Sequence, residues 1–516
     1  MNTFFNELNK TAEITHTENG GVSRSTSRSK VLDMFAMGAA YRNRSDEDVI
    51  FMFEQALNED ADLAMKCLFY IRDILSGQGE RRFFRVAYKW LCDAYPAMAI
   101  TNIKLIPEYG RWDDLVYITE GTSCEQVAFA FITHQLALDV ESKTPSLLGK
   151  WMPSQNASNS ETKRLGIKLA KYIGLSSREY RKVLSNLRKR INIVERLMSE
   201  DRWDEIEFDK IPSKAGLIYR NAFARNEITA KKYESFIKNK KTKVNADALY
   251  PHDIARKALD WNMIRKPYTD VDRIALQKYW NNLKDFYNGK QENAIAVIDV
   301  SGSMTGVPME AAISLGAYIA EKSTGPFANH FITFSARPKF VKFEGIDIVD
   351  KFHKCKGAEW GMNTNLQAVF DLLFNIAKRE HVNPEDIPKR LYIFSDMEFD
   401  KCVFFKPEKD NSSRSGLYGW GYRNDTVNSI EEVNSDLEKI ERKWDQYGIP
   451  FPQVVFWNLN ARHNLIPAIG EGFSYVSGFS PVMIDTILGG KTGYDLMIEK
   501  LVKSGRYDKI KAEGSI

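Results

Sequence analysis

The stretch that decides the fold is Ala294–Met304, which reads AIAVIDVSGSM. Six of the seven residues from Ala294 to Val300 are apolar, the pattern of a parallel strand that is covered on both faces. The run stops at three oxygen-bearing side chains, Asp299, Ser301 and Ser303, with Gly302 allowing a tight turn between the serines. We therefore predict a buried strand that ends in a loop of carboxylate and hydroxyl groups.

Two later segments place further oxygens at comparable positions. Thr364 stands just before a long apolar-periodic helix, and Asp396 follows the apolar run RLYIFS. In a doubly wound sheet ligands collect outside the carboxyl ends of the strands, so we expect Asp299, Thr364 and Asp396 to meet there. Mg²⁺ and Mn²⁺ prefer carboxylate and hydroxyl oxygens as ligands over the side chains of histidine or cysteine. The alternative is that Ser301 and Ser303 only cap a turn.

This set of residues resembles the metal-ion-dependent adhesion site of von Willebrand factor A domains. The pattern of that family is DxSxS, then a threonine, then an aspartate, and here it reads Asp299, Ser301, Ser303, Thr364 and Asp396. The resemblance implies a doubly wound, Rossmann-like α/β domain with a bound divalent cation. A partner protein would complete the coordination of this cation with an Asp or Glu side chain.

The surrounding pattern agrees with an α/β domain over residues 286–516. Apolar runs predict strands near 294–300, 330–336, 389–395, 452–458 and 473–476, with an edge strand at 339–343. Helical patterns alternate with them near 309–323, 364–379, 430–447 and 491–503, which implies a parallel sheet with helices on both faces. Residues 400–428 interrupt the alternation and are predicted to be an insertion.

The preceding part, residues 30–285, reads as helix after helix. Ser45 with the three acids that follow it marks one helix start, and Ala64, Cys67, Leu68 and Ile71 show the apolar spacing of the next helix. Successive helix pairs predict a HEAT-like helical-repeat domain. Residues 1–29 are polar and are predicted to be a flexible arm.

Composition bounds the class of protein. The chain has 516 residues, 43% hydrophobic and 27% charged, which predicts a globular protein of two or three cores. It contains no apolar run of membrane-spanning length and no apolar signal core at its start. The five cysteines show no CxxC spacing, which favours a reducing compartment and a cytoplasmic location.

Positive charge is concentrated in one part of the chain. Residues 161–260 hold 24 Lys and Arg against 14 Asp and Glu, whereas the whole chain has a net charge of only +4. A helix predicted over 176–198 turns a row of cations, Arg178, Lys182, Lys189 and Arg196, away from its apolar stripe. Such a row is either a solvated face or a surface that attracts a polyanion.

Four blocks in the helical part carry a second resemblance: FYIRDILSGQGERRFFR, EYGRWDDL, LLGKWMPSQNASNSETK and LYPHDIARKAL. They resemble the TROVE module of Ro autoantigens and telomerase-associated proteins, and also a bacterial, phage and plant family with the same layout. Ro proteins place helical repeats before a von Willebrand A domain and bind Y RNAs and misfolded RNAs. The helical part here looks shorter, which leaves closure into a ring open.

The resemblance implies that this chain binds structured or misfolded non-coding RNA through its basic helical face. Further candidate contacts are Arg81, Arg85, Lys150, Lys163, Arg164 and His252, although His252 serves equally well in a structural hydrogen bond. The alternative function is a metal-dependent protein-interaction or assembly module without RNA. We do not expect an enzyme, because Asp299, Asp396 and Glu398 come with no recognisable second metal site or general base.

Overall fold

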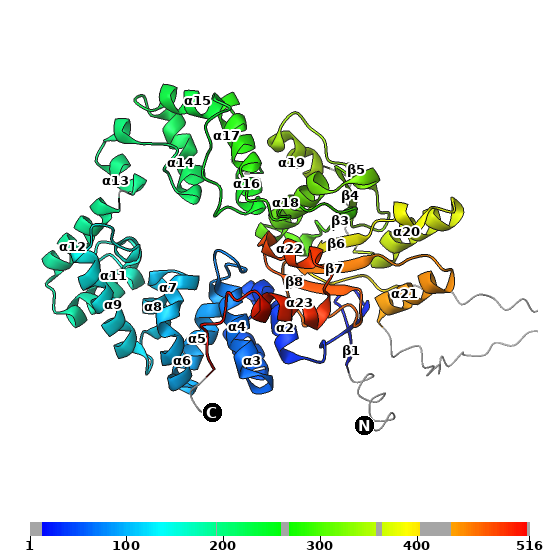
Figure 1. The fold of residues 1–516 in the computed structure, drawn as a ribbon, viewed down its shortest axis with the longest axis horizontal. Helices are drawn as coiled ribbons and strands as arrows, with labels where there is room; N and C mark the ends of the chain where they lie inside the picture. Colours follow the sequence, from blue (N-terminus) through cyan, green and yellow to red (C-terminus); the bar gives the residue numbers. More distant parts are fainter. Residues whose placement is uncertain (1–12, 192, 260–267, 358–363, 403–434, 513–516) are drawn as a thin grey trace, which may run out of the picture.

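A computed structural model describes residues 13–191, 193–259, 268–357, 364–402 and 435–512. It shows a helical region followed by a mostly parallel six-stranded sheet (Figure 1), so the predicted fold class is confirmed. None of the described helices is long and apolar enough to cross a membrane.

The helical region is built from a succession of helices. They are α2 (Lys30–Met37), α3 (Asp46–Glu59), α4 (Ala61–Arg72), α5 (Arg82–Ala94), α6 (Pro96–Asn102), α7 (Ile106–Tyr109), α8 (Trp112–Thr119), α9 (Glu125–Glu141), α10 (Leu148–Trp151), α11 (Ser160–Ile173), α12 (Ser177–Arg190), α13 (Val194–Ser199), α14 (Ser213–Arg225), α15 (Ala230–Lys238), α16 (Pro251–Ala258) and α17 (Asp270–Asn281). Ser45 caps α3 by accepting from the backbone N–H of Asp48, as the sequence predicted.

The prediction of one continuous helix over 176–198 is wrong in its second half, where the structure has two helices. The capping box of Ser176 and Glu179 starts α12 as expected, but α12 ends at Arg190 and a separate helix, α13, begins at Val194. Ile193 between them has an extended backbone. Both helices bury an apolar face, so apolar residues recur at helical spacing on both sides of the break. Periodicity alone therefore could not reveal the break.

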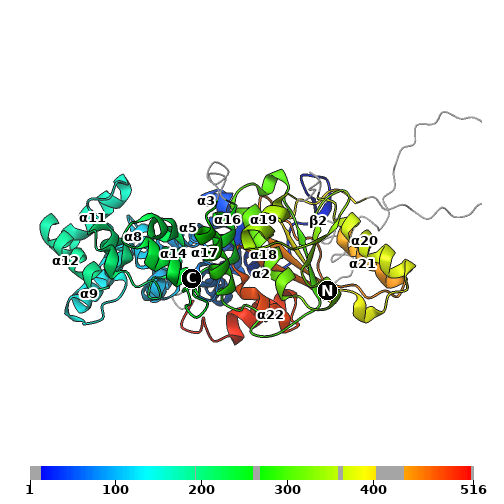
Figure 2. The same cartoon turned by 90° about the horizontal axis from the view of Figure 1, so that it is seen from above.

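The sheet has the strand order β5-β4-β3-β6-β7-β8. Its strands are β3 (Ala294–Ile298), β4 (His330–Thr333), β5 (Phe340–Lys342), β6 (Arg390–Ser395), β7 (Gln453–Asn458) and β8 (Phe473–Ser477), and only β5 is antiparallel. The helices of this part are α18 (Val307–Lys322), α19 (Ile348–Lys356), α20 (Leu366–Arg379), α21 (Asp436–Gln446), α22 (Ile484–Leu488) and α23 (Gly493–Ile498). Figure 2 shows α18 on the face toward the helical region and α20 and α21 on the opposite face, which buries both faces of β3 and β6.

Both ends of the helical region contact the sheet domain. At one end α2 packs on β8, and at the other α16 packs on α18 and α17 on α19. The C-terminal segment adds a further link, since Arg506 Nε lies 2.9 Å from Asp73 Oδ2 and the ring of Tyr507 stacks on that of Tyr109. The helices and the sheet domain therefore close into a ring (Figure 1), which answers the point that the sequence left open.

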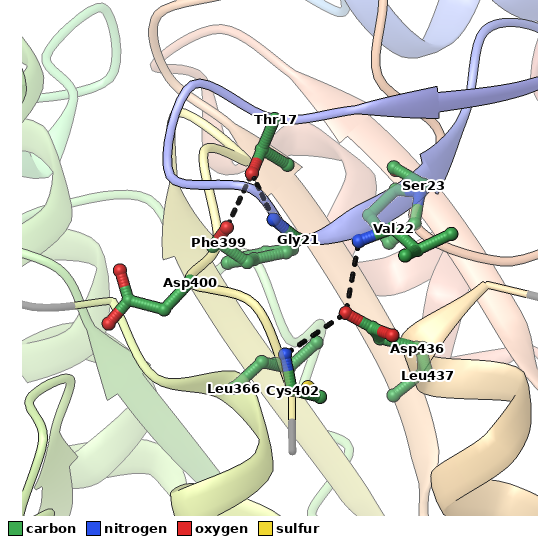
Figure 3. A pocket seen from close by; sticks show the side chains of 11 residues that line it. Thr17, Gly21, Val22, Ser23, Leu366, Phe399, Asp400, Cys402, Asp436 and Leu437 are labelled. Atoms are coloured by element: carbon green, nitrogen blue, oxygen red, sulfur yellow. Dashed lines mark hydrogen bonds between the residues drawn. The ribbon is translucent and has the colours of Figure 1, made fainter. Parts of the chain in front are cut away.

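Residues 13–29 differ from the predicted flexible arm. They form a hairpin, β1 (Ile14–His16) and β2 (Val22–Arg24), which docks on the sheet domain as shown in Figure 3. The Thr17 hydroxyl donates to the carbonyl of Phe399 at 2.5 Å, and the Val22 N–H donates to the Asp436 carboxylate at 3.0 Å. Polar contacts hold this segment, so it lacks the apolar pattern by which a strand is recognised. Residues 1–12 and most of the predicted insertion, 403–428, lie outside the described residues.

The docked hairpin leads to a prediction about stability. A Cβ atom added at Gly21 would lie 2.6 Å from the carbonyl oxygen of Phe399, so Gly21→Ala should lower the free energy of unfolding by about 1–3 kcal/mol. The matched control is Gly302→Ala, because a Cβ there meets nothing within 4 Å. Urea unfolding in a chelating buffer measures both variants, and equal stabilities would contradict the docking.

Candidate functional site

The first group of candidate residues lies where β3 and β6 end side by side. These strands pair in parallel, with Ile298 opposite Phe394, and the Asp299 N–H continues the ladder by donating to Phe394 O at 3.0 Å. Asp299 Oδ2 accepts from the Ser395 hydroxyl at 2.7 Å, and Oδ1 accepts from the Ser301 N–H at 2.8 Å. The pairing thus fixes the Asp299 carboxylate beside the end of β6.

The two serines of the loop lie next to each other. A short 3₁₀ turn, η5 (Gly302–Met304), follows Ser301, and the Ser301 and Ser303 hydroxyl oxygens are 3.0 Å apart. The Asn460 side chain, from the loop after β7, donates to the carbonyl of Ser303 at 3.2 Å. The loop is therefore held with both hydroxyls on one side of the turn.

The electrostatics of this group favour a cation. Asp299 and Asp396 are 0% and 1% exposed, and burial together with the nearby Asp396 carboxylate raises the pKa of Asp299 to about 6. Asp396 Oδ1 accepts from the Glu398 N–H at 3.2 Å, but Asp396 Oδ2 is buried without a hydrogen bond among the described residues. Because two buried carboxylates repel each other and one oxygen is unsatisfied, a divalent ion would relieve both costs. The oxygen donors present fit Mg²⁺ or Mn²⁺.

Thr364 is close to this group but is engaged elsewhere. Its hydroxyl donates to the carbonyl of Glu398 at 2.7 Å and accepts from the Asn19 amide at 3.2 Å. Within the described part of the chain, the structure therefore brings Asp299, Ser301, Ser303 and Asp396 together and keeps the Thr364 hydroxyl on the loop after β6.

Sequence reasoning missed the residues that surround Asp396. Arg462 Nε lies 3.3 Å from Asp396 Oδ2, and the same guanidinium pairs with Glu18 at 2.6 Å. His463 Nδ1 lies 2.7 Å from Glu398 Oε1. Arg462 and His463 follow the end of β7, where the rule for ligand positions in such sheets could have pointed to them. Glu18 lies in the hairpin turn and carries no comparable sequence signal.

The second group of candidates is the basic face of the helical region. Arg178, Lys182 and Lys189 are exposed on α12, as is Lys163 on α11, and among the described residues none of the four is in an ion pair. Arg196 departs from the predicted row, because it belongs to α13 and its guanidinium pairs with Glu200 at 2.9 Å. Arg164 is exposed but pairs with Glu120.

Arg81, Arg85 and Lys150 form a second group of candidates in the helical region. Burial and the neighbouring Arg111 and Arg85 lower the pKa of Arg81, so Arg81 lies among cations. Arg85 Nε donates to Asp114 Oδ1 at 2.7 Å. Both Arg111 and Lys150 lie over the ring of Trp151, at 4.0 and 5.5 Å from its centroid. Helix α10, which carries Lys150, packs on both α8 and α12, and it contacts α12 on the face of Leu187, opposite the exposed row of cations.

His252 is placed differently from the other candidates. Its ring packs 5.2 Å from the ring of Phe479, its side chain is 14% exposed, and burial lowers its pKa to about 4. A neutral, covered imidazole favours the structural reading of this residue over contact with phosphate.

The lowered pKa of His252 leads to a prediction about pH. Between its folded value of about 4 and its ordinary value near 6.5, the unfolded chain binds a proton that the folded chain does not. Stability should therefore fall as pH falls through this window, by up to roughly 3 kcal/mol from this group. His252→Phe should flatten that slope in urea unfolding, whereas His134→Phe, at an exposed position, should not. Equal slopes for wild type and His252→Phe would contradict the burial.

Two protein-family models and a viral protein match this chain over most of its length. The family model for a domain of unknown function, DUF2828, matches residues 17–144 and 148–299, more than half of the chain. That for a second domain of unknown function, DUF7788, matches residues 293–513. The uncharacterized protein L728 of Acanthamoeba polyphaga mimivirus is 30% identical over 527 residues, which cover 93% of this chain and 85% of that protein.

A solved structure is also similar. The Ro (RSR) protein of Deinococcus radiodurans matches with a TM-score of 0.38 and 12% identity, over 92% of this chain and 99% of that chain. A likeness at this level says nothing about function.

Proposed function

The chain belongs to the family defined by the domain of unknown function DUF2828, and for this member we propose an RNA-binding role exercised through the basic face of its helical region. The RNA would be a structured or misfolded non-coding RNA, as the resemblance of four sequence blocks to TROVE modules implies. We propose a binding role and no catalysis.

The observation that carries the proposal is the row of exposed cations on α12. Arg178, Lys182 and Lys189 are free of ion pairs among the described residues, although many surface cations elsewhere in the helical region are paired with acids. Unpaired cations on one helix face can each contact a phosphate and release a counterion. The separate cluster of Arg81, Arg111 and Lys150 adds further cations, although Arg111 is paired with Asp113 and, with Lys150, lies over the Trp151 ring.

Nucleic acid that copurifies with the full chain tests this proposal. We expect ribonuclease-sensitive material, enriched in structured RNA, whose binding weakens steeply as salt rises because phosphate contacts dominate it. Sequencing identifies the RNA, and gel shifts over a range of salt concentrations measure the dependence. A purified chain that carries no RNA and shifts neither folded nor single-stranded RNA at low salt would refute the role.

We also propose that the loop after β3 holds a divalent cation, Mg²⁺ or Mn²⁺. Asp299, Ser301, Ser303 and Asp396 would supply protein oxygens, with Thr364 nearby. Asp396 Oδ2 is buried without a hydrogen bond among the described residues and faces Arg462 Nε at 3.3 Å, which leaves it a coordination position and favours this assignment. The second candidate function follows from it, because a cation with an open position can bind an Asp or Glu of a protein partner, so that the chain would link a protein to RNA.

The cysteines are consistent with the cytoplasmic location that we propose. All five are buried and free, as is usual in a reducing compartment.

A further inference from the structure

A second group of metal-ligand atoms lies beside the first and is built from three distant segments. Carboxylate oxygens of Glu18 and Glu398 and a ring nitrogen of His463 all lie within 4.8 Å of one another. Glu18 belongs to the turn of the β1–β2 hairpin, Glu398 to the loop after β6, and His463 to the loop after β7. None of these residues belongs to the DxSxS pattern.

The geometry of the group is fixed from several sides. The Glu18 N–H donates to Glu398 Oε2 at 2.7 Å, and the Asn19 amide donates to the carbonyl of Glu398 at 2.7 Å. The hairpin that carries Glu18 is itself docked by Thr17 on Phe399, as Figure 3 shows. Glu398 is 1% exposed, whereas the His463 side chain is 52% exposed, so the group has a buried base and an open side toward solvent.

Charge provides an independent reason to expect a cation here. Four carboxylates follow one another here, those of Glu18, Asp299, Asp396 and Glu398. Among the described residues, Arg462 is the one arginine or lysine that forms an ion pair with this group, through Glu18 and Asp396. Both Asp396 Oδ2 and Arg462 Nε, which face each other across 3.3 Å, are buried without a hydrogen bond. One divalent ion at the Asp299 site still leaves one negative charge unbalanced. Asp299, Asp396 and Glu398 are buried, whereas the Glu18 side chain is 45% exposed, so solvent screens part of this charge and the buried carboxylates supply the rest of the attraction for a cation.

The close contact between His463 and Glu398 bears on whether a cation binds here. A neutral imidazole nitrogen without a proton would present its lone pair to Glu398 Oε1 at 2.7 Å, which is repulsive. Either Nδ1 carries a proton and donates it to Glu398 Oε1 in a hydrogen bond, or a cation replaces that proton and binds both atoms after they move slightly apart. The second possibility also satisfies the Glu18 carboxylate, whose Oε1 lies 3.8 Å from the same nitrogen.

We propose that Glu18, Glu398 and His463 form a second cation site, which binds a first-row transition-metal ion such as Zn²⁺ in preference to Mg²⁺. Imidazole with two carboxylates is a ligand set that zinc accepts and magnesium disfavours. Ligand atoms bound to a tetrahedral zinc lie roughly 3.3–3.5 Å apart. The two separations from His463 Nδ1, 2.7 Å to Glu398 and 3.8 Å to Glu18, bracket that value, and the three ligand atoms all lie within 4.8 Å of one another, so side-chain shifts complete the site. The exposed side leaves a fourth position for water or a ligand atom.

Zinc binding by the full chain in excess Mg²⁺ tests this site. After removal of metals with a chelator, we expect one Zn²⁺ per chain to bind, and Co²⁺ in its place to give a visible absorption spectrum with imidazole among the ligands. His463→Ala and Glu18→Gln should weaken Zn²⁺ binding on the order of 100-fold. His134→Ala is the matched control, since His134 is exposed on α9 and should leave binding unchanged.

Asp299→Asn separates the two sites. This variant should keep the Zn²⁺ and lose only the response to Mg²⁺, and circular dichroism in metal-free buffer shows whether each variant is folded. The inference fails if folded His463→Ala and Glu18→Gln bind Zn²⁺ as wild type does, because His463 is then a protonated partner of Glu398. It fails equally if Asp299→Asn removes the Zn²⁺, which would place the ion at the first site. Neither result depends on RNA binding.

Discussion

Replacing Arg178, Lys182 and Lys189 together by glutamate should weaken RNA binding on the order of 100-fold at moderate salt. Each of these side chains is exposed on α12, so the change removes three phosphate contacts and adds three repulsive charges without disturbing the buried stripe of Tyr180, Leu184 and Leu187. The slope of log affinity against log salt should also become shallower, by about 2 for three contacts to single-stranded RNA.

The control for this experiment carries the same change of charge on the other side of the ring. Lys378, Lys389 and Lys491 are exposed on the sheet domain, and their replacement by glutamate should cost only the weak, long-range part of the attraction. Gel shifts or fluorescence anisotropy compare the two triple variants at several salt concentrations. Equal losses would show that RNA responds to total charge and would contradict a specific role for α12.

Replacing Asp299 by asparagine should abolish the response of the protein to Mg²⁺. The substitution keeps the shape of the side chain but removes the carboxylate that lies at the centre of the group, so affinity for Mg²⁺ should fall at least about 100-fold. Wild type should gain thermal stability as Mg²⁺ is added, because an ion that binds only the folded state stabilises it. The variant should gain none.

Calorimetric titration and thermal unfolding with and without Mg²⁺ measure this effect. Asp247→Asn serves as the control, because Asp247 is an exposed acid of the helical region and should keep the full response. RNA binding by Asp299→Asn should equal that of wild type if the two sites act separately. A Mg²⁺ response that survives in Asp299→Asn would contradict the proposed site.

The sheet and its polar edge were predictable because their signals are local. Near-continuous apolar runs predicted β3, β6 and β7, and polar side chains directly after the first two of these runs marked the edge at which ligands collect. The proximity of Asp299 and Asp396 was predictable because their two strands are neighbours in this kind of sheet. Thr364 was harder to place, since its hydroxyl is taken by the carbonyl of Glu398, a contact that no spacing encodes.

The parts that could not be predicted depend on contacts between distant segments. The break between α12 and α13 leaves the spacing of apolar residues unchanged, so the spacing does not reveal it. Because of this break Arg196 lies on α13, where it pairs with Glu200, and not in the exposed row on α12. The hairpin at residues 13–29 is held by polar contacts to residues nearly 400 positions away. Glu18, Glu398 and His463 therefore converge only when the hairpin docks on the loops after β6 and β7.

The most direct test of the central claim is to map where RNA touches the protein, by ultraviolet crosslinking of the full chain to its copurified RNA followed by mass spectrometry of the peptides. If RNA binds through the helical face, crosslinked peptides should fall on α11 and α12 and around Trp151. Crosslinks confined to the sheet domain would contradict the account.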